Sequence, residues 1–124
     1  MTEEYIRIIS KTGLNSKLLA THLGRCSIEE WEAQLDNNFE GSKEFKAIES
    51  LELYYDSLYE DLTNKINSGI HKIIYCTNIE EFSETTNLPP VMFFVTQKTM
   101  NDIAIEHPES HIQFIDDSVD KKIQ

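Results

Sequence analysis

Three residues with reactive or charged side chains lie at or just beyond the carboxyl ends of segments that the sequence predicts as strands. They are Cys76, Lys98 and Asp116. If those strands are parallel, their carboxyl ends meet at one edge of a sheet, where ligands commonly bind. A helix beginning beside Cys76 would favour its thiolate, the nucleophilic form of cysteine. This arrangement predicts, as one alternative, a small α/β enzyme or ligand-binding protein that uses the strand-end crevice. The other interpretation of Cys76 is a buried, inert thiol.

The loop that follows Cys76 weakens the enzymatic alternative, because it carries no glycine, no arginine and no phosphate-binding spacing. His107 and His111 have the four-residue spacing of metal-binding helices. Pro108 lies between them at a predicted helix end, so their rings need not converge. We therefore predict a chain with no catalytic residues, no metal site and no cofactor.

A row of carboxylates lies along the longest predicted helix. At about 100° per residue, its four members fall within about 80° of one another. Like charges four residues apart destabilise an isolated helix by about 0.2–0.5 kcal/mol a pair, so the row is either a solvated face or a surface for a basic partner. Tyr59 and Trp31 are predicted to be aromatic anchors of that surface. The carboxylates are Glu49, Glu52, Asp56 and Glu60.

The segment LLATHLGRCSIEEWEAQL, residues 18–35, resembles the helix-turn-helix of phage-repressor-type DNA-binding proteins. Ala20 would let two helices cross closely, Gly24 would make the turn, and Ser27 would begin the second helix. The resemblance covers only this segment and implies, as a second alternative, a DNA-binding regulator. Its phosphate contacts would come from Arg7, Lys11, Lys17 and Arg25.

The second helix of this motif argues against DNA binding. It carries four carboxylates and no Arg or Lys, whereas phosphate binding and base reading depend on basic side chains. We therefore expect a pair of packed helices that bury four apolar side chains and make no direct contact with nucleic acid. Those side chains are Leu19, Leu23, Ile28 and Trp31.

The first 68 residues are predicted to be mainly helical. One helix is expected to begin at Asn15 or Ser16 and another at Ser27, which forms a capping box with Glu30. The longest helix is predicted for residues 42–68, because apolar side chains recur there at steps of three and four. These side chains are Phe45, Ile48, Leu51, Tyr55, Leu58, Leu62 and Ile66.

The rest of the chain is predicted to be a small parallel βαβαβ unit over residues 69–117. Helices beginning at Asn78 and Thr96 would connect its strands, and the all-apolar run VMFFV would be the central one. The predicted fold is thus α/β in one domain, 1–124, in which residues 118–124 are a frayed tail. The three strands are expected at residues 71–76, 91–95 and 112–115.

The chain is strongly acidic, with 22 Asp and Glu against 11 Lys and Arg and a net charge of −11. Such a surface repels phosphates and anionic membranes and attracts basic proteins. The start MTEEYIRIIS is not typical of a secretory signal, and no apolar run approaches the roughly 20 residues of a membrane span. With only two cysteines as well, a reducing, cytoplasmic location is predicted.

Small size, acidity and the carboxylate row together predict a non-catalytic protein-binding inhibitor. In composition it resembles immunity proteins, antitoxins and phage-encoded anti-defence proteins. Its predicted partner is a basic protein, such as a toxin, a nuclease or another protein that acts on nucleic acid. No membrane partner and no particular oligomeric state are predicted.

Overall fold

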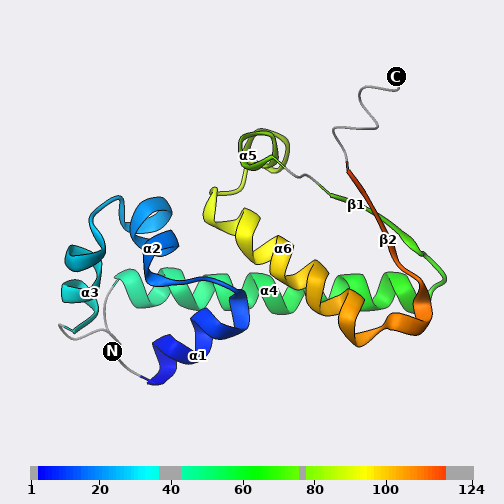
Figure 1. Ribbon diagram of the computed structural model, residues 1–124, viewed down its shortest axis with the longest axis horizontal. Helices are drawn as coiled ribbons and strands as arrows, with labels where there is room; N and C mark the ends of the chain where they lie inside the picture. Colours follow the sequence, from blue (N-terminus) through cyan, green and yellow to red (C-terminus); the bar gives the residue numbers. More distant parts are fainter. Residues whose placement is uncertain (1–2, 37–42, 76–77, 117–124) are drawn as a thin grey trace.

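The computed structural model describes residues 3–36, 43–75 and 78–116. In these ranges the chain is mainly helical, and one long helix extends past most of the other elements (Figure 1). Those elements are, in chain order, α1 (Glu3–Thr12), α2 (Ser16–Leu19), the π-helix η1 (Ala20–Gly24), α3 (Ile28–Asp36), α4 (Lys43–Asn67), β1 (Lys72–Tyr75), α5 (Ile79–Thr86), α6 (Val91–Glu106), the 3-10 helix η3 (Pro108–Ser110) and β2 (Gln113–Asp116).

Helix α4 confirms the longest helix that the sequence predicts. Its apolar stripe is buried at five positions, and α1 and α6 both pack against it. At about 1.5 Å per residue, its 25 residues extend over roughly 37 Å. The buried side chains are Ile48, Leu51, Tyr55, Leu62 and Ile66.

The core is arranged in two clusters along α4. The first holds side chains such as Tyr5, Leu19 and Trp31, which α1, α2 and α3 bring against the first half of α4. The second lies at the other end of α4, where Ile73 of β1 and Ile103 of α6 are buried. Burial of each large apolar side chain contributes roughly 1.5–3 kcal/mol, so α4 is stabilised by packing at both ends.

The predicted three-stranded α/β fold is wrong, because residues 91–95 form the start of helix α6 and not a central strand. Val91, Val95, Thr99 and Ile103 recur every four residues, and each is at most 1% exposed. A short apolar run is compatible with a strand or with a buried helix, and its periodicity alone does not separate the two. Pro90 directly precedes the first helical residue and already has helical backbone angles, φ −55° and ψ −31°, and the fixed φ of proline is compatible with the start of a helix.

The described strands form a two-stranded parallel sheet. Lys72 pairs with Gln113 and Tyr75 with Asp116, at the positions where the sequence predicts the first and third strands. Helices α5 and α6 connect β1 to β2. The C-terminal part is therefore a βααβ unit attached to a helical protein, and not the predicted βαβαβ unit over residues 69–117.

The turn between α2 and α3 differs from the predicted helix-turn-helix. Gly24 ends the π-helix η1, and the residue with a left-handed backbone is Arg25, with φ 51°. A Cβ atom at Gly24 would lie 2.7 Å from Cε3 of Trp31. This glycine therefore allows the chain to approach Trp31 closely, while Ile28, predicted to be buried, is 39% exposed.

Three predicted helix caps are confirmed. The side-chain oxygen of Asn15 accepts a hydrogen bond from the Leu18 N–H at 2.9 Å. The hydroxyl of Ser27 accepts a hydrogen bond from the Glu30 backbone N–H at 3.1 Å and donates one to the Glu30 carboxylate at 3.2 Å. The side-chain oxygen of Asn78 accepts hydrogen bonds from the N–H groups of Glu80 and Glu81 at 2.9 and 3.1 Å. These contacts satisfy backbone donors that lack a partner at the start of a helix.

Candidate protein-binding surface

Glu52, one of the four carboxylates of the predicted row, is bound by two cations of α1. Arg7 donates to both carboxylate oxygens, at 2.6 and 2.9 Å, and the Lys11 ammonium lies 3.0 Å from Oε2. The hydrogen bonds from Arg7, followed by those from Lys11, lower the pKa of Glu52 from 4.5 to about 2. Its side chain is only 15% exposed, so Glu52 connects α1 to α4 and is not a free surface charge.

Asp56 takes part in the same network but stays accessible. Its carboxylate lies 2.9 Å from the Lys11 ammonium, and its side chain is 53% exposed. The Lys11 ammonium also lies 5.8 Å from the centre of the Tyr55 ring. Its hydrogen bonds to Asp56 and then to Glu52 raise the pKa of Lys11, despite the opposing effect of burial. Asp56 therefore has one bound cation and an open side toward solvent.

Tyr55 extends this polar network to α6. Its hydroxyl donates to Asp102, and the Lys98 ammonium binds both oxygens of that carboxylate at 2.6 and 2.7 Å. Burial, together with the hydrogen bond to Asp102, raises the pKa of Tyr55 above its ordinary range. These contacts join α4 to α6, and they pair the half-buried Lys98 with Asp102.

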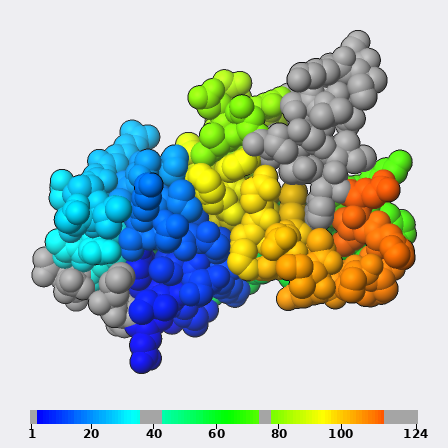
Figure 2. All heavy atoms as spheres, in the orientation of Figure 1, coloured from blue at the N-terminus to red at the C-terminus, as the bar shows by residue number. Residues whose placement is uncertain are grey.

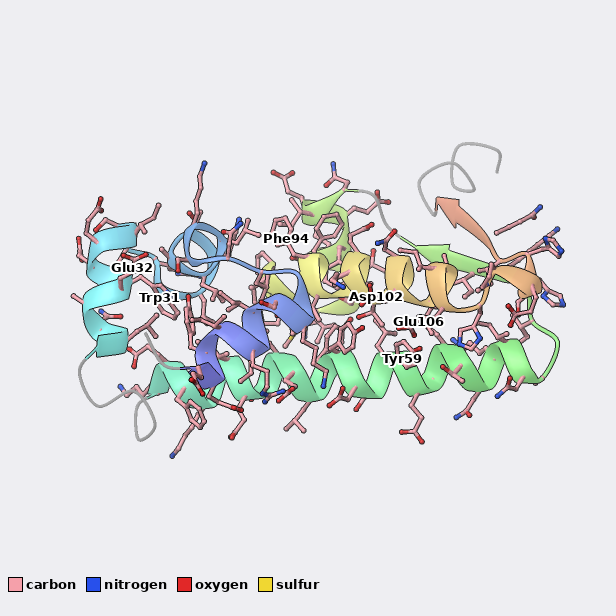
Figure 3. All side chains as sticks on the ribbon, turned by 60° about the horizontal axis from the view of Figure 1, so that its bottom comes forward. Trp31, Glu32, Tyr59, Phe94, Asp102 and Glu106 are labelled. Carbon is pink, nitrogen blue, oxygen red and sulfur yellow. The ribbon has the colours of Figure 1, made fainter. Side chains whose placement is uncertain are left out.

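The two predicted aromatic anchors contribute to the interior. Trp31 is 1% exposed, and its indole N–H donates to the Tyr5 hydroxyl at 3.1 Å. Tyr59 is partly buried and stacks on Tyr55, with ring centroids 6.1 Å apart. Figure 3 shows Trp31 at the α3 end of the molecule and Tyr59 beside Asp102, between α4 and α6. As the molecule stands, Trp31 offers no surface to a partner.

The face of α4 that points to solvent consists of different residues from the predicted row. At about 100° per residue, Glu49, Leu53, Asp56 and Glu60 fall within about 60° of one another, and Glu52 lies to one side of them. All four are exposed. Leu53, in the middle of the helix, is 64% exposed. We call these four residues the outer α4 face.

Leu53 was missed by reasoning from the carboxylates alone. Its spacing of four, three and seven residues from Glu49, Asp56 and Glu60 is visible in the sequence. The sequence feature that identifies Leu53 as exposed is its helical position, which lies outside the stripe of buried apolar residues. An exposed leucine among carboxylates resembles the apolar centre and charged rim of a protein interface.

The predicted strand-end crevice is not present as proposed. Lys98 was expected just beyond a strand, but it lies inside α6 and pairs with Asp102. Cys76 lies outside the described residues, and Asp116 is the last residue of β2. Because residues 91–95 are helical, the strand end that was to bring Lys98 to these residues does not exist.

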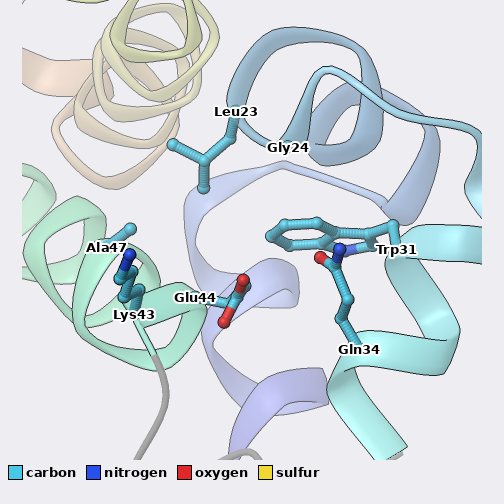
Figure 4. Close-up of a pocket in the computed structure, with 7 residues that line it drawn as sticks. All are labelled: Leu23, Gly24, Trp31, Gln34, Lys43, Glu44 and Ala47. Atoms are coloured by element: carbon cyan, nitrogen blue, oxygen red, sulfur yellow. The ribbon is translucent and has the colours of Figure 1, made fainter.

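A small pocket of about 240 Å³ lies between η1, α3 and α4 (Figure 4). The Trp31 ring forms one wall, and the charged groups of Lys43 and Glu44 come from the start of α4. No nucleophilic side chain is among its lining residues, so the pocket does not suggest catalysis. The lining residues are Leu23, Gly24, Trp31, Gln34, Lys43, Glu44 and Ala47.

Two features are absent from residues 3–36, 43–75 and 78–116. Within them, no three His, Cys, Asp or Glu side chains are grouped so that they could hold a metal ion. In the same part of the chain, no helix combines the length and the apolar character that crossing a membrane requires.

Comparison with protein families, with curated proteins and with solved structures finds no match. The site must therefore be interpreted from its own geometry. That geometry consists of an internal charge network through Glu52 and Asp102, and an exposed acidic face that includes Leu53.

Proposed function

We propose that this chain is a non-catalytic inhibitor that binds a basic protein through the outer α4 face. The partner would be a toxin, a nuclease or another protein that acts on nucleic acid, as for immunity proteins, antitoxins and phage anti-defence proteins. Carboxylates presented in a row can occupy the positions that phosphates would take on such a partner. Binding there would block access to nucleic acid.

One observation carries this proposal. Leu53 is 64% exposed between carboxylates that also point to solvent. A row of carboxylates alone is equally compatible with a face that is simply exposed to water. A large apolar side chain is different, because its transfer from water into an interface is favourable. A partner that covers Leu53 and presents Lys or Arg to Glu49 and Glu60 would bury the leucine and pair the charges.

Direct binding of nucleic acid is disfavoured by the surface of α3. Glu29 and Glu30 are exposed there, at the start of the helix that would enter the major groove. Arg7 and Lys11, two of the cations that a DNA-binding regulator would use, are occupied by Glu52. The net charge of −11 adds a general repulsion of phosphate.

The proposal is tested by capturing partners from a lysate of the source cells at low and at high salt, with mass spectrometry as the readout. The test variant is Glu49→Lys with Glu60→Lys. The matched control is Glu106→Lys with Glu109→Lys, which makes the same change of charge at exposed residues, the last of α6 and one in η3. We expect one basic protein that is captured at low salt, lost at high salt, lost with the test variant and kept with the control.

The captured protein must then be purified and assayed for its own activity on nucleic acid. Inhibition by the natural chain, and much weaker inhibition by the test variant, would support the proposed function. Equal capture by both variants would show that the outer α4 face is not the interface. A captured partner whose activity is unchanged by the chain would contradict the inhibitory role.

A further inference from the structure

A second surface feature lies on α5, which is separated from α4 by α6 in the views of Figures 1 and 3. It is an open pocket of about 390 Å³, within the range of roughly 300–1,000 Å³ typical of small-ligand sites. Figure 2 shows the surface indented between the N-terminal helices in blue and α5 in yellow-green. The lining residues are His22, Ile79, Glu80, Ser83, Glu84 and Pro90.

One wall of this pocket is an aromatic ring held in place from behind. The His22 ring contacts the Phe94 ring, with centroids 5.3 Å apart and planes at 44°. Phe94 in turn meets Phe93 edge-on at 5.5 Å, and Phe93 meets Phe82 at 5.7 Å. This chain of rings connects η1, α6 and α5. It fixes the position of His22 relative to the rest of the pocket.

The opposite wall carries two carboxylates on successive turns of one helix. Glu80 and Glu84 are four residues apart on α5, and both are exposed. Residues at this spacing lie on the same face, where two like charges repel each other. In the part of the chain that the structure describes, neither carboxylate has a cation partner. Ile79 and Pro90 add apolar surface to the lining of the same pocket.

We propose that this pocket binds an arginine side chain of the basic partner. A guanidinium is planar, so it can stack on the His22 ring while its fork of N–H groups reaches the two carboxylates. The apolar stem of arginine would pack on Ile79 and Pro90. A lysine ammonium is a point charge that gains less from a flat ring and from paired acceptors, so arginine is the better occupant.

This inference rests on the proposed function for the identity of the partner, but the pocket can be tested without one. The probe is N-acetyl-arginine methylamide, and its neutral isostere is the citrulline derivative. Both are titrated into the isotopically labelled full chain, and the NMR signals of His22, Ile79 and Ser83 are followed. We expect saturable shifts of these signals with arginine, on the order of millimolar affinity, and none with citrulline.

Two double variants decide which residues are responsible. Glu80→Gln with Glu84→Gln should weaken arginine binding about fivefold or more, because charge-assisted hydrogen bonds are the strong ones. Glu106→Gln with Glu109→Gln makes the same charge change at exposed residues outside both proposed surfaces and should leave arginine binding unchanged. Circular dichroism spectra that match the natural chain would confirm that both variants are folded.

The pocket proposal is overturned if arginine gives no saturable shift, if citrulline binds equally, or if the Glu80 and Glu84 variant binds as before. Its failure differs from that of the proposed function. Arginine binding with no basic protein captured would retain the pocket and reject the inhibitor. Capture through the outer α4 face with no arginine binding would retain the inhibitor and reject the pocket.

Discussion

At the scale of single residues, the carboxylate of Glu52 shows how a predicted surface charge becomes a structural one. Arg7 and Lys11 converge on it from α1, and its folded-state pKa of about 2 lies below the ordinary value of 4.5. A depressed pKa means that the ionised form stabilises the fold. This contribution is complete above about pH 5 and is lost as the pH falls toward 2.

Glu52→Gln is therefore expected to lower the free energy of unfolding by about 1–2 kcal/mol at pH 7. The pKa shift alone would suggest more, but Arg7 is about half exposed, and solvent screens such pairs. The difference between natural chain and variant should shrink as the pH falls from 5 toward 2. Urea denaturation at several pH values measures it, with the exposed Glu49→Gln as the control. A deficit that persists unchanged at the lowest pH would reject this account.

Ser83 offers a prediction of the opposite sign. In the described part of the chain, its Oγ is the buried side-chain oxygen without a hydrogen-bond partner. Such an atom loses its bonds to water and gains none in return. Ser83→Ala should therefore raise the free energy of unfolding by about 1 kcal/mol.

The control for Ser83 is Ser50→Ala on α4, because the Ser50 hydroxyl is exposed and donates to the Lys46 carbonyl at 3.0 Å. Both substitutions gain the same helix propensity. They differ in that Ser83 loses an unpaired buried hydroxyl, whereas Ser50 loses an exposed hydroxyl with its hydrogen bond. Thermal denaturation of the two variants in the same buffer measures the difference. An equal effect at both positions would contradict the reasoning.

At the scale of elements, Gly24 determines how closely η1 approaches α3. Alanine is the better helix former by about 1 kcal/mol, so propensity alone predicts that Gly24→Ala is stabilising. A Cβ atom there would lie 2.7 Å from Trp31 Cε3 and 3.0 Å from Cys26 Sγ. Overpacking of this kind costs about 1–3 kcal/mol, and we expect a net loss of about 1–2 kcal/mol.

The single tryptophan makes the Gly24 prediction directly visible. Gly24→Ala should change the fluorescence of Trp31, because the ring must move to admit the new methyl group. Gly69→Ala is the control, since a Cβ atom at Gly69 meets nothing within 4 Å. That variant should be destabilised by backbone strain alone, with unchanged tryptophan emission. If the Gly24→Ala variant were more stable than the natural chain, the Trp31 ring would have moved aside without lowering the free energy of unfolding, and this prediction would be wrong.

The elements also show what the sequence can and cannot predict. The long helix and the caps at Ser27 and Asn78 follow from local patterns, namely a repeat of three and four residues and side chains that satisfy nearby N–H groups. The strand predicted at the start of α6 is wrong because VMFFV is apolar at every position. Such a run is compatible with a buried strand or a buried helix, and the local sequence does not show which elements surround it.

The candidate site was harder to predict than the helices because its charges pair across the fold. Arg7 and Glu52 are 45 residues apart in sequence, so no spacing rule connects them. The buried state of Trp31 likewise depends on how α1 meets α3. Glu49, Asp56 and Glu60 could be placed on one face from the helical period, and Leu53 could have been added by the same period.

At the scale of the whole molecule, the net charge of −11 sets the long-range behaviour of the chain. Exposed charges interact over about 10 Å at 0.1 M salt and over shorter distances as salt is added. An acidic protein that meets a basic partner is therefore steered at low ionic strength. The internal pairs at Glu52 and Asp102 contribute little to steering, because their charges are already neutralised by Arg7, Lys11 and Lys98.

The association rate with the captured partner is accordingly expected to fall about tenfold or more between roughly 0.05 and 0.5 M salt, whereas dissociation changes less. Stopped-flow mixing of the two purified proteins measures both rates. Glu49→Lys with Glu60→Lys should lower the rate at low salt and flatten its salt dependence, because those charges lie where contact is made. Glu106→Lys with Glu109→Lys changes the net charge equally and should have a smaller effect. If both double variants slow association equally, association is steered by the net charge of the chain and not by the outer α4 face. An association rate that is independent of salt would contradict electrostatic steering altogether.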